Sequence, residues 1–95
     1  MTPTFDADGY PTENAEQIIA NWPIDDAAGW LNYCIAAWNQ HYGSVREENG
    51  LVTFATGGWS GNESILSSMH DNYVLWVFAW ESSHRGGVEV YRRPT

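Results

Sequence analysis

The sequence predicts an α+β fold: a single domain in which a three- or four-stranded antiparallel sheet packs against two or three helices. Segments with apolar residues at helical spacing occur beside segments rich in β-branched and aromatic residues, in the order α, α, β, β, α, β, β. An Asn-Gly pair, Asn49-Gly50, separates two extended segments, as in tight hairpin turns. A chain of 95 residues supports one core, so residues 1–95 are expected to form one domain, with residues 1–11 as an irregular lead-in.

The first helix is expected to begin after Thr12. The Thr12 side chain suits an N-cap, because its oxygen can accept a hydrogen bond from a free N–H group of the first turn. Glu13 and Glu16 then lie in that turn, where the helix dipole favours negative charge. Pro23 is expected to stop the helix, since proline lacks the N–H group that a helix interior needs.

The second helix is expected over residues 26–41, with Asp25 or Asp26 near its N-cap. Its apolar residues recur at positions i, i+1, i+4, i+5 and i+8, which gives one continuous stripe. The stripe consists of Trp30, Leu31, Cys34, Ile35 and Trp38. We therefore expect this helix to pack across the sheet.

The remaining segments are mostly extended. Residues 44–47 and 51–56 are expected to form a hairpin around the Asn-Gly turn. Residues 73–81 have apolar side chains on both faces, which favours a strand at the centre of the sheet. After a turn over residues 82–87, residues 88–92 form an amphipathic strand that is expected to pair with residues 73–81.

A glycine-rich turn joins the second strand to the third helix and is expected to have a structural role: Gly57, Gly58 and Trp59. Ser60 and Glu63 follow with the S-x-x-E spacing of a capping box. The spacing predicts a helix over residues 61–70 with Ser60 as its N-cap.

Motifs for catalysis and for metal binding are incomplete. Around Ser60, the nucleophile pattern G-x-S-x-G has Asn62 in place of its last glycine. Two aspartates precede Gly9 as in a calcium loop, but Ala15 stands where the bidentate glutamate belongs. The three histidines lack metal-ligand spacing. We therefore expect no enzymatic activity, no cofactor and no metal ion.

The charge is strongly acidic and unevenly distributed. The formal net charge is −8, lysine is absent, and residues 1–45 carry six acids and no arginine. Such a charge argues against direct binding of nucleic acid and favours a partner with a basic surface. An acidic surface that only confers solubility is the alternative. A single cysteine, Cys34, and the lack of a signal peptide or an apolar run of membrane-spanning length favour the cytoplasm.

Six tryptophans are more than a core of this size readily hides, so one or two are expected at the surface, where aromatic side chains anchor partners. The predicted partner-binding residues combine acids with one aromatic anchor: Asp25, Asp26, Glu13, Glu16 and Tyr10. His84 and Arg85, at a glycine-containing hairpin tip, form a second candidate contact, and an ordinary turn is the alternative there.

The segment T-G-G-W-S-G-N-E at residues 56–63, followed by Trp76, W-E-S-S at residues 80–83 and R-G-G at residues 85–87, resembles a family of small, uncharacterised bacteriophage and prophage proteins. The opening D-A-D-G-Y-P-T at residues 6–12 is similar to theirs. Small acidic phage proteins without enzymatic motifs are often inhibitors of bacterial defence, including anti-CRISPR proteins. The resemblance therefore implies a non-enzymatic inhibitor that binds a basic surface of a host nucleic-acid-handling complex.

A small-molecule binder is the alternative function. Arg85, Arg92 and Arg93, together with aromatic side chains, could capture a nucleotide-like ligand, because guanidinium groups suit phosphate and aromatic faces suit a base. Such a protein would act as a sponge for that ligand.

Overall fold

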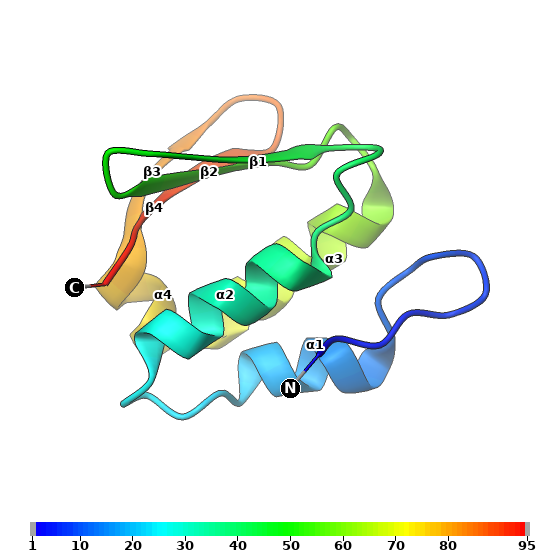
Figure 1. Ribbon diagram of the computed structural model, residues 1–95, viewed down its shortest axis with the longest axis horizontal. Coiled ribbons are helices and arrows are strands. Elements are labelled where there is room, and N and C mark those ends of the chain that lie inside the picture. The colour runs from blue at the N-terminus through cyan, green and yellow to red at the C-terminus, as the bar shows by residue number, and fades with distance from the viewer. Residues whose placement is uncertain (1, 95) are drawn as a thin grey trace.

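The computed structural model describes residues 2–94 and confirms the α+β class. A four-stranded antiparallel sheet forms one layer, and the helices lie to one side of it (Figure 1). The elements, in chain order, are α1 (Glu13–Ala20), α2 (Ala27–Ala37), β1 (Ser44–Glu48), β2 (Leu51–Ala55), α3 (Ser60–Asp71), α4 (Tyr73–Ala79), β3 (Trp80–His84) and β4 (Val88–Arg92). Met1, which belongs to the predicted lead-in, and Thr95, the last residue of the predicted domain, lie outside the described residues.

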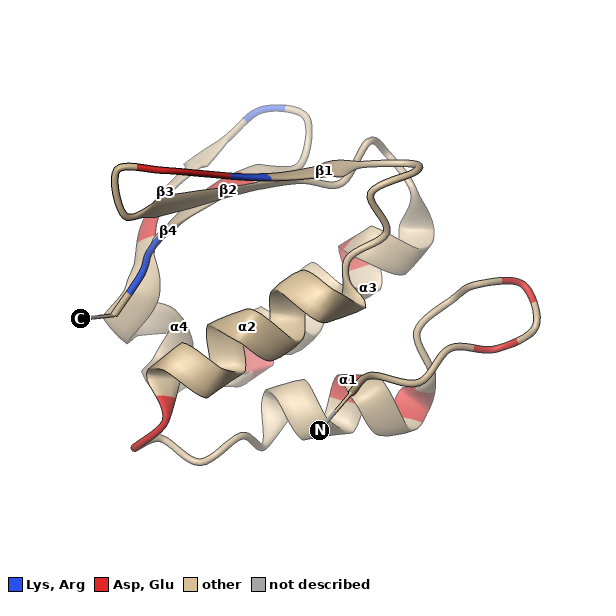
Figure 2. Cartoon of the chain, viewed as in Figure 1, with Lys and Arg blue, Asp and Glu red and all other residues tan. Residues whose placement is uncertain are grey.

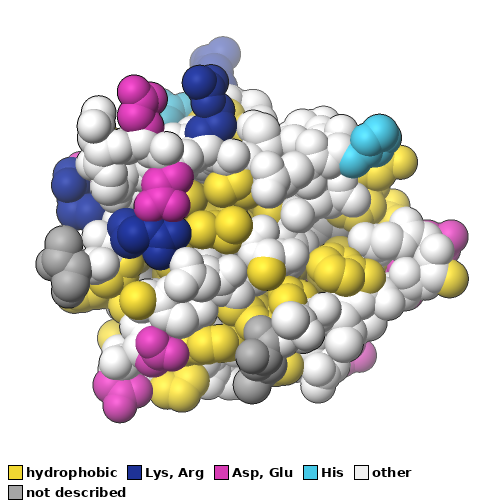
Figure 3. Space-filling view, in the orientation of Figure 1, with side chains coloured by type: hydrophobic (Ala, Val, Ile, Leu, Met, Phe, Trp, Pro, Cys, Tyr) yellow, Lys and Arg dark blue, Asp and Glu magenta, His cyan; other side chains and the backbone are white. Residues whose placement is uncertain are grey.

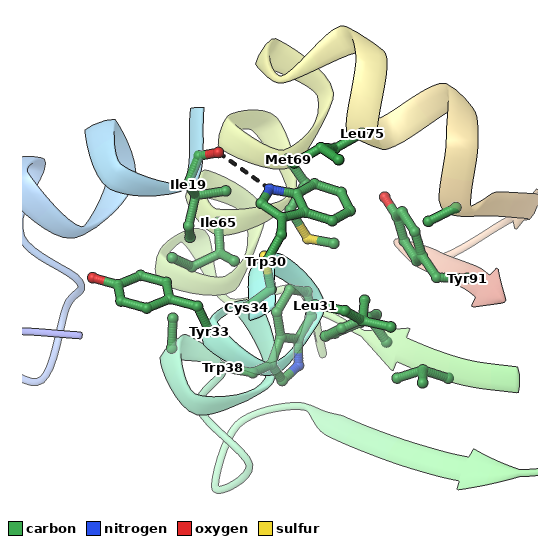
Figure 4. Packing of buried hydrophobic residues seen from close by; sticks show 14 residues of the cluster. Ile19, Trp30, Leu31, Tyr33, Cys34, Trp38, Ile65, Met69, Leu75 and Tyr91 are labelled. Carbon is green, nitrogen blue, oxygen red and sulfur yellow. Dashed lines mark hydrogen bonds between the residues drawn. The ribbon is translucent and has the colours of Figure 1, made fainter. Parts of the chain in front are cut away.

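The core lies between α2 and the inner face of the sheet (Figure 4). Trp30 of α2 is fully buried, and its indole N–H donates to the carbonyl oxygen of Ile19 at 3.1 Å. Across the layer, Tyr91 of β4 packs edge-on against Trp30, with ring centroids 6.2 Å apart, and against Phe54 of β2 at 5.5 Å. The predicted stripe of α2 is therefore the main face that packs on the sheet.

The starts of α1 and α2 are confirmed. Thr12 Oγ1 accepts a hydrogen bond from the N–H of Ala15 at 3.2 Å, and Asp26 Oδ1 accepts one from the N–H of Gly29 at 3.1 Å. The end of α2 is four residues earlier than predicted, because Trp38 is extended and its indole N–H donates to the carbonyl oxygen of Ala55. That bond draws the chain away from the helix axis.

The strands have the order β1-β2-β4-β3, so β2 and β4 are central and β1 and β3 form the edges. Asn49 and Gly50 connect β1 to β2 with φ angles of 55° and 78°, which is the geometry of a tight hairpin turn and confirms that prediction. On β2, Val52 and Phe54 are buried in the core that the sheet shares with the helices, and the alternate residues are only partly buried.

The prediction of a strand over residues 73–81 is wrong. Tyr73–Ala79 is the helix α4, and the strand β3 begins only at Trp80. Leu75 and Ala79, one helical turn apart, are the side chains that α4 buries. The final hairpin exists, but its first strand is β3 at an edge of the sheet, and its turn is shorter than the predicted residues 82–87 because β3 extends to His84.

The capping box is also wrong. Trp59 is the N-cap of α3, and within the described residues no side chain caps this helix start. Ser60 is the first helical residue, and its hydroxyl lies 3.4 Å from the Tyr10 hydroxyl instead of capping the helix. The turn itself is as predicted, since Gly57 and Gly58 both have positive φ angles, 66° and 76°.

A candidate partner-binding surface

The helix α4 exposes large apolar side chains to solvent. Tyr73 is 69% exposed, Phe78 68%, Val74 54% and Val77 51%. Trp80, which follows the helix, is 38% exposed. Contiguous exposed apolar side chains of this size are uncommon on monomeric proteins and mark interaction sites. We call these five residues the α4 surface.

Polar contacts at its start hold α4 in place. The buried side-chain amide of Asn72 donates from Nδ2 to the carbonyl oxygens of Ile19, at 3.0 Å, and Trp22, at 3.2 Å. The backbone N–H of Trp76 bonds the carbonyl oxygen of Asn72 at 2.8 Å, so the helix begins at this junction. The α4 surface is thereby fixed relative to the connection between α1 and α2.

That connection adds an exposed apolar side chain and a hollow. Ile24 is 66% exposed, and it borders a hollow of about 330 Å³ that opens beside α4. The lining combines both segments and the chain end: Ile24, Asp25, Asp26, Ala27, Ala28, Val74, Leu75, Phe78 and Pro94. A partner side chain can therefore enter between the two segments.

The two acids of this hollow have different roles. Asp26 is occupied by its own chain, since Oδ1 caps α2 and Oδ2 accepts the indole N–H of Trp22 at 3.1 Å. Asp25 is exposed, and its side chain makes no hydrogen bond or ion pair within residues 2–94. Acidic side chains border hydrophobic ones at the lower left of Figure 3, on the end of the molecule where this connection lies. Of the two predicted contacts, Asp25 is the one available to a partner.

The structure does not bring the predicted partner-binding residues into one site. Glu13 and Glu16 are in the first turn of α1, whereas Asp25 and Asp26 lie on the connection beyond the other end of that helix (Figure 2). Tyr10 lies just before that first turn, with its ring against Trp59 at a centroid distance of 4.7 Å. The predicted acids thus belong to two surfaces.

His84 and Arg85 belong to a third place, the turn between β3 and β4. Both side chains are exposed, as the hairpin-tip prediction expected. His84 Nε2 lies 2.9 Å from the Ser82 hydroxyl, and Arg85 has no ion pair in the part of the chain that the structure describes. His84 lies at the opposite end of β3 from Trp80, so the turn is separated by the length of that strand from the α4 surface.

The arginines proposed for a nucleotide-like ligand do not converge. The guanidinium of Arg92 pairs with Glu81 at 3.0 Å. Arg93 pairs with Glu47 through two nitrogens and donates to Asn32 Oδ1 at 2.9 Å. Arg93 lowers the pKa of Glu47 through this hydrogen-bonded contact. Both groups are therefore occupied by neighbouring side chains, which weakens the small-molecule alternative.

Charge is segregated between the two layers. All four arginines lie in the strands, in the β3–β4 turn or directly after β4, and these segments also contain four acids. The other eight acids lie in the lead-in, the helices and the α1–α2 connection, which contain no arginine and no lysine (Figure 2). The helical side of the molecule therefore carries the net negative charge.

A buried carboxylate, Glu89, is a second polar feature, besides the Asn72 side chain, that the sequence did not reveal. It accepts hydrogen bonds from the Tyr91 hydroxyl at 2.6 Å and the Ser83 hydroxyl at 2.9 Å, and His70 Nε2 lies 2.9 Å away. Burial raises the pKa of Glu89, but the bonds from Tyr91, His70 and Ser83 lower it by more, so the pKa lies below its ordinary value.

This cluster contains Ser, His and Glu but lacks the geometry of a nucleophilic triad. The Ser83 hydroxyl donates to the carboxylate, whereas an activated serine would donate to the imidazole. Among residues 2–94, no group of three or more His, Cys, Asp or Glu side chains is gathered to hold a metal ion. The cluster instead links the end of α3 to β3 and β4.

No protein-family model matches the chain, and neither a curated protein nor a solved structure gives a significant match. Within the described residues, no helix has both the length and the apolar character that crossing a bilayer requires. The α4 surface, with Ile24 and Asp25, is accordingly the candidate functional site that rests on the geometry of this chain.

Proposed function

We propose that the protein is a non-enzymatic inhibitor that binds a host protein through the α4 surface, Ile24 and Asp25. The observation that supports this most is the exposure of Tyr73, Val74, Val77 and Phe78 on one short helix. The resemblance to phage-encoded proteins favours a target among nucleic-acid-handling complexes of bacterial defence, such as a CRISPR effector, in the cytoplasm of the infected cell.

The composition of the surface suits a tight protein contact. Buried aromatic side chains each remove on the order of 150 to 250 Å² from water and dominate the energetics of interfaces. Tyr73 and Phe78 can supply that contribution only when a partner covers them, because both are more than two-thirds exposed in the free protein. The hollow beside Ile24 accepts an apolar side chain from the partner.

The charge at the rim favours a basic partner over a second copy of the chain. Two copies that met through α4 would bring their Asp25 and Asp26 carboxylates together, and the helices and the α1–α2 connection contain no lysine or arginine to offset them. A basic surface meets Asp25 with opposite charge, and the acidic helical layer accelerates the encounter. Occupation of such a surface would exclude the nucleic acid that it normally binds.

The first experiment identifies the target and tests inhibition directly. Tagged protein is used to capture partners from a bacterial lysate, and each partner is then tested for nucleic acid binding with and without the inhibitor. We expect competition between this protein and the nucleic acid. A captured partner that binds nucleic acid equally well in its presence argues against inhibition by occupation.

The second experiment uses a matched pair of charge reversals. Asp25→Lys should slow association several-fold and weaken its salt dependence, because it removes electrostatic attraction at the contact. Glu48→Lys makes the same change in net charge on β1, away from α4, and should have a smaller effect. Asp26 is not reversed, since it caps α2. Equal effects of the two variants would mean that Asp25 contributes only through long-range attraction and makes no contact with the partner.

The third experiment tests the apolar contact. Phe78→Ser should weaken binding by at least about tenfold, because truncation of an aromatic hot spot costs about 2 kcal/mol or more and about 1.4 kcal/mol is a factor of ten. Leu51→Ser, on the outer face of the sheet, is the control and should bind normally.

Titration calorimetry with nucleotides distinguishes the small-molecule alternative, for which heat of binding is expected without any protein partner.

A further inference from the structure

The glycines of residues 57–61 hold an aromatic cluster that the α4 surface does not explain. Gly57 has φ +66°, and a Cβ atom there would lie 1.8 Å from the carbonyl oxygen of Tyr42. A Cβ atom at Gly61 would lie 2.3 Å from Cζ3 of the Trp59 ring. The first glycine lets the chain approach Tyr42, and the second leaves room for the indole over the start of α3.

The result is a column of rings at the end of the molecule opposite α4. Trp59 stacks on Tyr42 with centroids 5.0 Å apart and an interplanar angle of 25°. Tyr10 packs on Trp59 at 4.7 Å and 33°, and His41 meets the Tyr42 ring edge-on at 4.9 Å. Trp59 thus lies between two tyrosines that come from different parts of the chain.

The outer members of this column face solvent. Tyr42 is 54% exposed and Tyr10 is 38% exposed, whereas Trp59 is partly covered. Rings that served only the core would not need such exposure. The buried side chain of Asn62 makes two hydrogen bonds to the backbone of Asn39, and these bonds hold the neighbouring loops together without the rings. The tyrosine faces are therefore available for a ligand.

Acidic groups accompany these rings. The Asp6 carboxylate accepts the backbone N–H of Tyr10 at 3.0 Å and closes the turn of the lead-in that carries Asp8. Glu63, in the first turn of α3, is also exposed, but it lines the groove between α1 and α3. An exposed aromatic residue with a carboxylate beside it, as Tyr10 has in Asp6, attracts a planar cation, and a guanidinium group satisfies both contacts at once.

We infer that Tyr42, Trp59 and Tyr10 form a second recognition surface, which binds arginine side chains of a partner protein. The guanidinium plane stacks on an exposed tyrosine face while its N–H groups donate to a nearby carboxylate. This inference is independent of the α4 surface, which lies at the other end of the chain's long axis. Two surfaces at opposite ends allow one small protein to contact two places on a partner.

The test is an NMR titration of the full-length protein with short peptides that contain two arginines, two lysines or two citrullines. We expect the arginine peptide to shift the indole N–H resonance of Trp59 and not that of Trp80, and to bind at least about threefold more tightly than the lysine peptide. The citrulline peptide, which is neutral, should not bind. Equal binding of the arginine and lysine peptides, with shifts spread over all acidic residues, would overturn the inference.

A pair of matched variants locates the contact. Tyr42→Leu removes an exposed ring without changing charge and should abolish the preference for arginine, while Tyr73→Leu makes the same change on α4 and should preserve it. Backbone amide resonances of Val52 and Phe54 in the core report whether each variant is folded. If Tyr42→Leu folds and binds the arginine peptide as the native protein does, the rings are not the site. If a variant does not fold, the comparison of the three peptides on the native protein still tests the inference.

Discussion

Asn72 and Trp22 are joined across 50 residues of sequence by a hydrogen bond of 3.2 Å from the side-chain amide to a carbonyl oxygen. The same amide nitrogen donates to the carbonyl oxygen of Ile19 at 3.0 Å. These bonds fix the start of α4 against the end of α1, and they therefore position the apolar residues of α4 beside Ile24. A single buried side chain sets the shape of the candidate partner-binding surface.

Asn72→Ala should destabilise the protein by about 1 to 3 kcal/mol, because it leaves the partly buried Trp22 carbonyl oxygen without its donor. Ile19 keeps a second donor, the Trp30 indole, which limits the loss there. Urea unfolding followed by tryptophan fluorescence measures the change. Asn14→Ala, an exposed position in α1, is the control and should change stability by less than about 0.5 kcal/mol. Equal stability of the two variants would show that the junction does not depend on Asn72.

The misassigned strand and the unforeseen surface have one cause. Residues 73–79 bury Leu75 and Ala79 at helical spacing, but their solvent-facing side is apolar too, so the helical period is hidden in the sequence. Valine and aromatic residues also favour strands. A polar outer face would have revealed the helix, and its absence is the same feature that makes α4 a candidate binding surface.

Local signals predicted the fold where one residue decides the conformation. Thr12, Asp26 and the Asn49-Gly50 turn act through their immediate neighbours, and all three predictions are confirmed. Ser60 had a convincing local pattern, yet the indole of Trp59 occupies the space above the first turn of α3. Contacts such as those of Asn72 and Glu89 join distant segments, so no local pattern in the sequence could indicate them.

Glu89 should make stability depend on pH. Its pKa in the folded protein is below the ordinary value, so its contribution is present above the unfolded pKa of about 4.3 and is lost as pH falls through the folded pKa. Glu89→Gln should therefore cost about 1 to 3 kcal/mol near neutral pH, and the difference from the native protein should shrink in acid. Thermal unfolding between about pH 7 and pH 3 measures both effects.

The exposed Glu48→Gln variant is the control for this titration, and its difference from the native protein should stay small throughout. A Glu89→Gln penalty that is constant across the pH range would contradict the prediction. It would mean that the shape of the side chain matters there and its charge does not.

Thr12 and Ser60 should differ in their effect on stability. Thr12→Ala removes a cap that bonds the Ala15 N–H, which typically costs about 1 kcal/mol. Ser60→Ala removes no cap, since the Ser60 hydroxyl only approaches Tyr10 at 3.4 Å, so it should cost less than about 0.5 kcal/mol. Chemical denaturation of the two variants compares them directly. A loss of stability for Ser60→Ala as large as that for Thr12→Ala would indicate that Ser60 caps α3 in solution.

Gly61 gives a prediction in which the sign of the effect is decisive. In an exposed helix, Gly→Ala stabilises by about 1 kcal/mol, because glycine has the lower helix propensity. At Gly61 the new methyl group would meet the Trp59 ring, so Gly61→Ala should instead destabilise by about 1 to 3 kcal/mol. In a Trp59→Leu background the ring is gone, and the same substitution should become neutral or stabilising. Unfolding free energies of the four proteins form a double-mutant cycle, and additive effects would refute the proposed contact between the two residues.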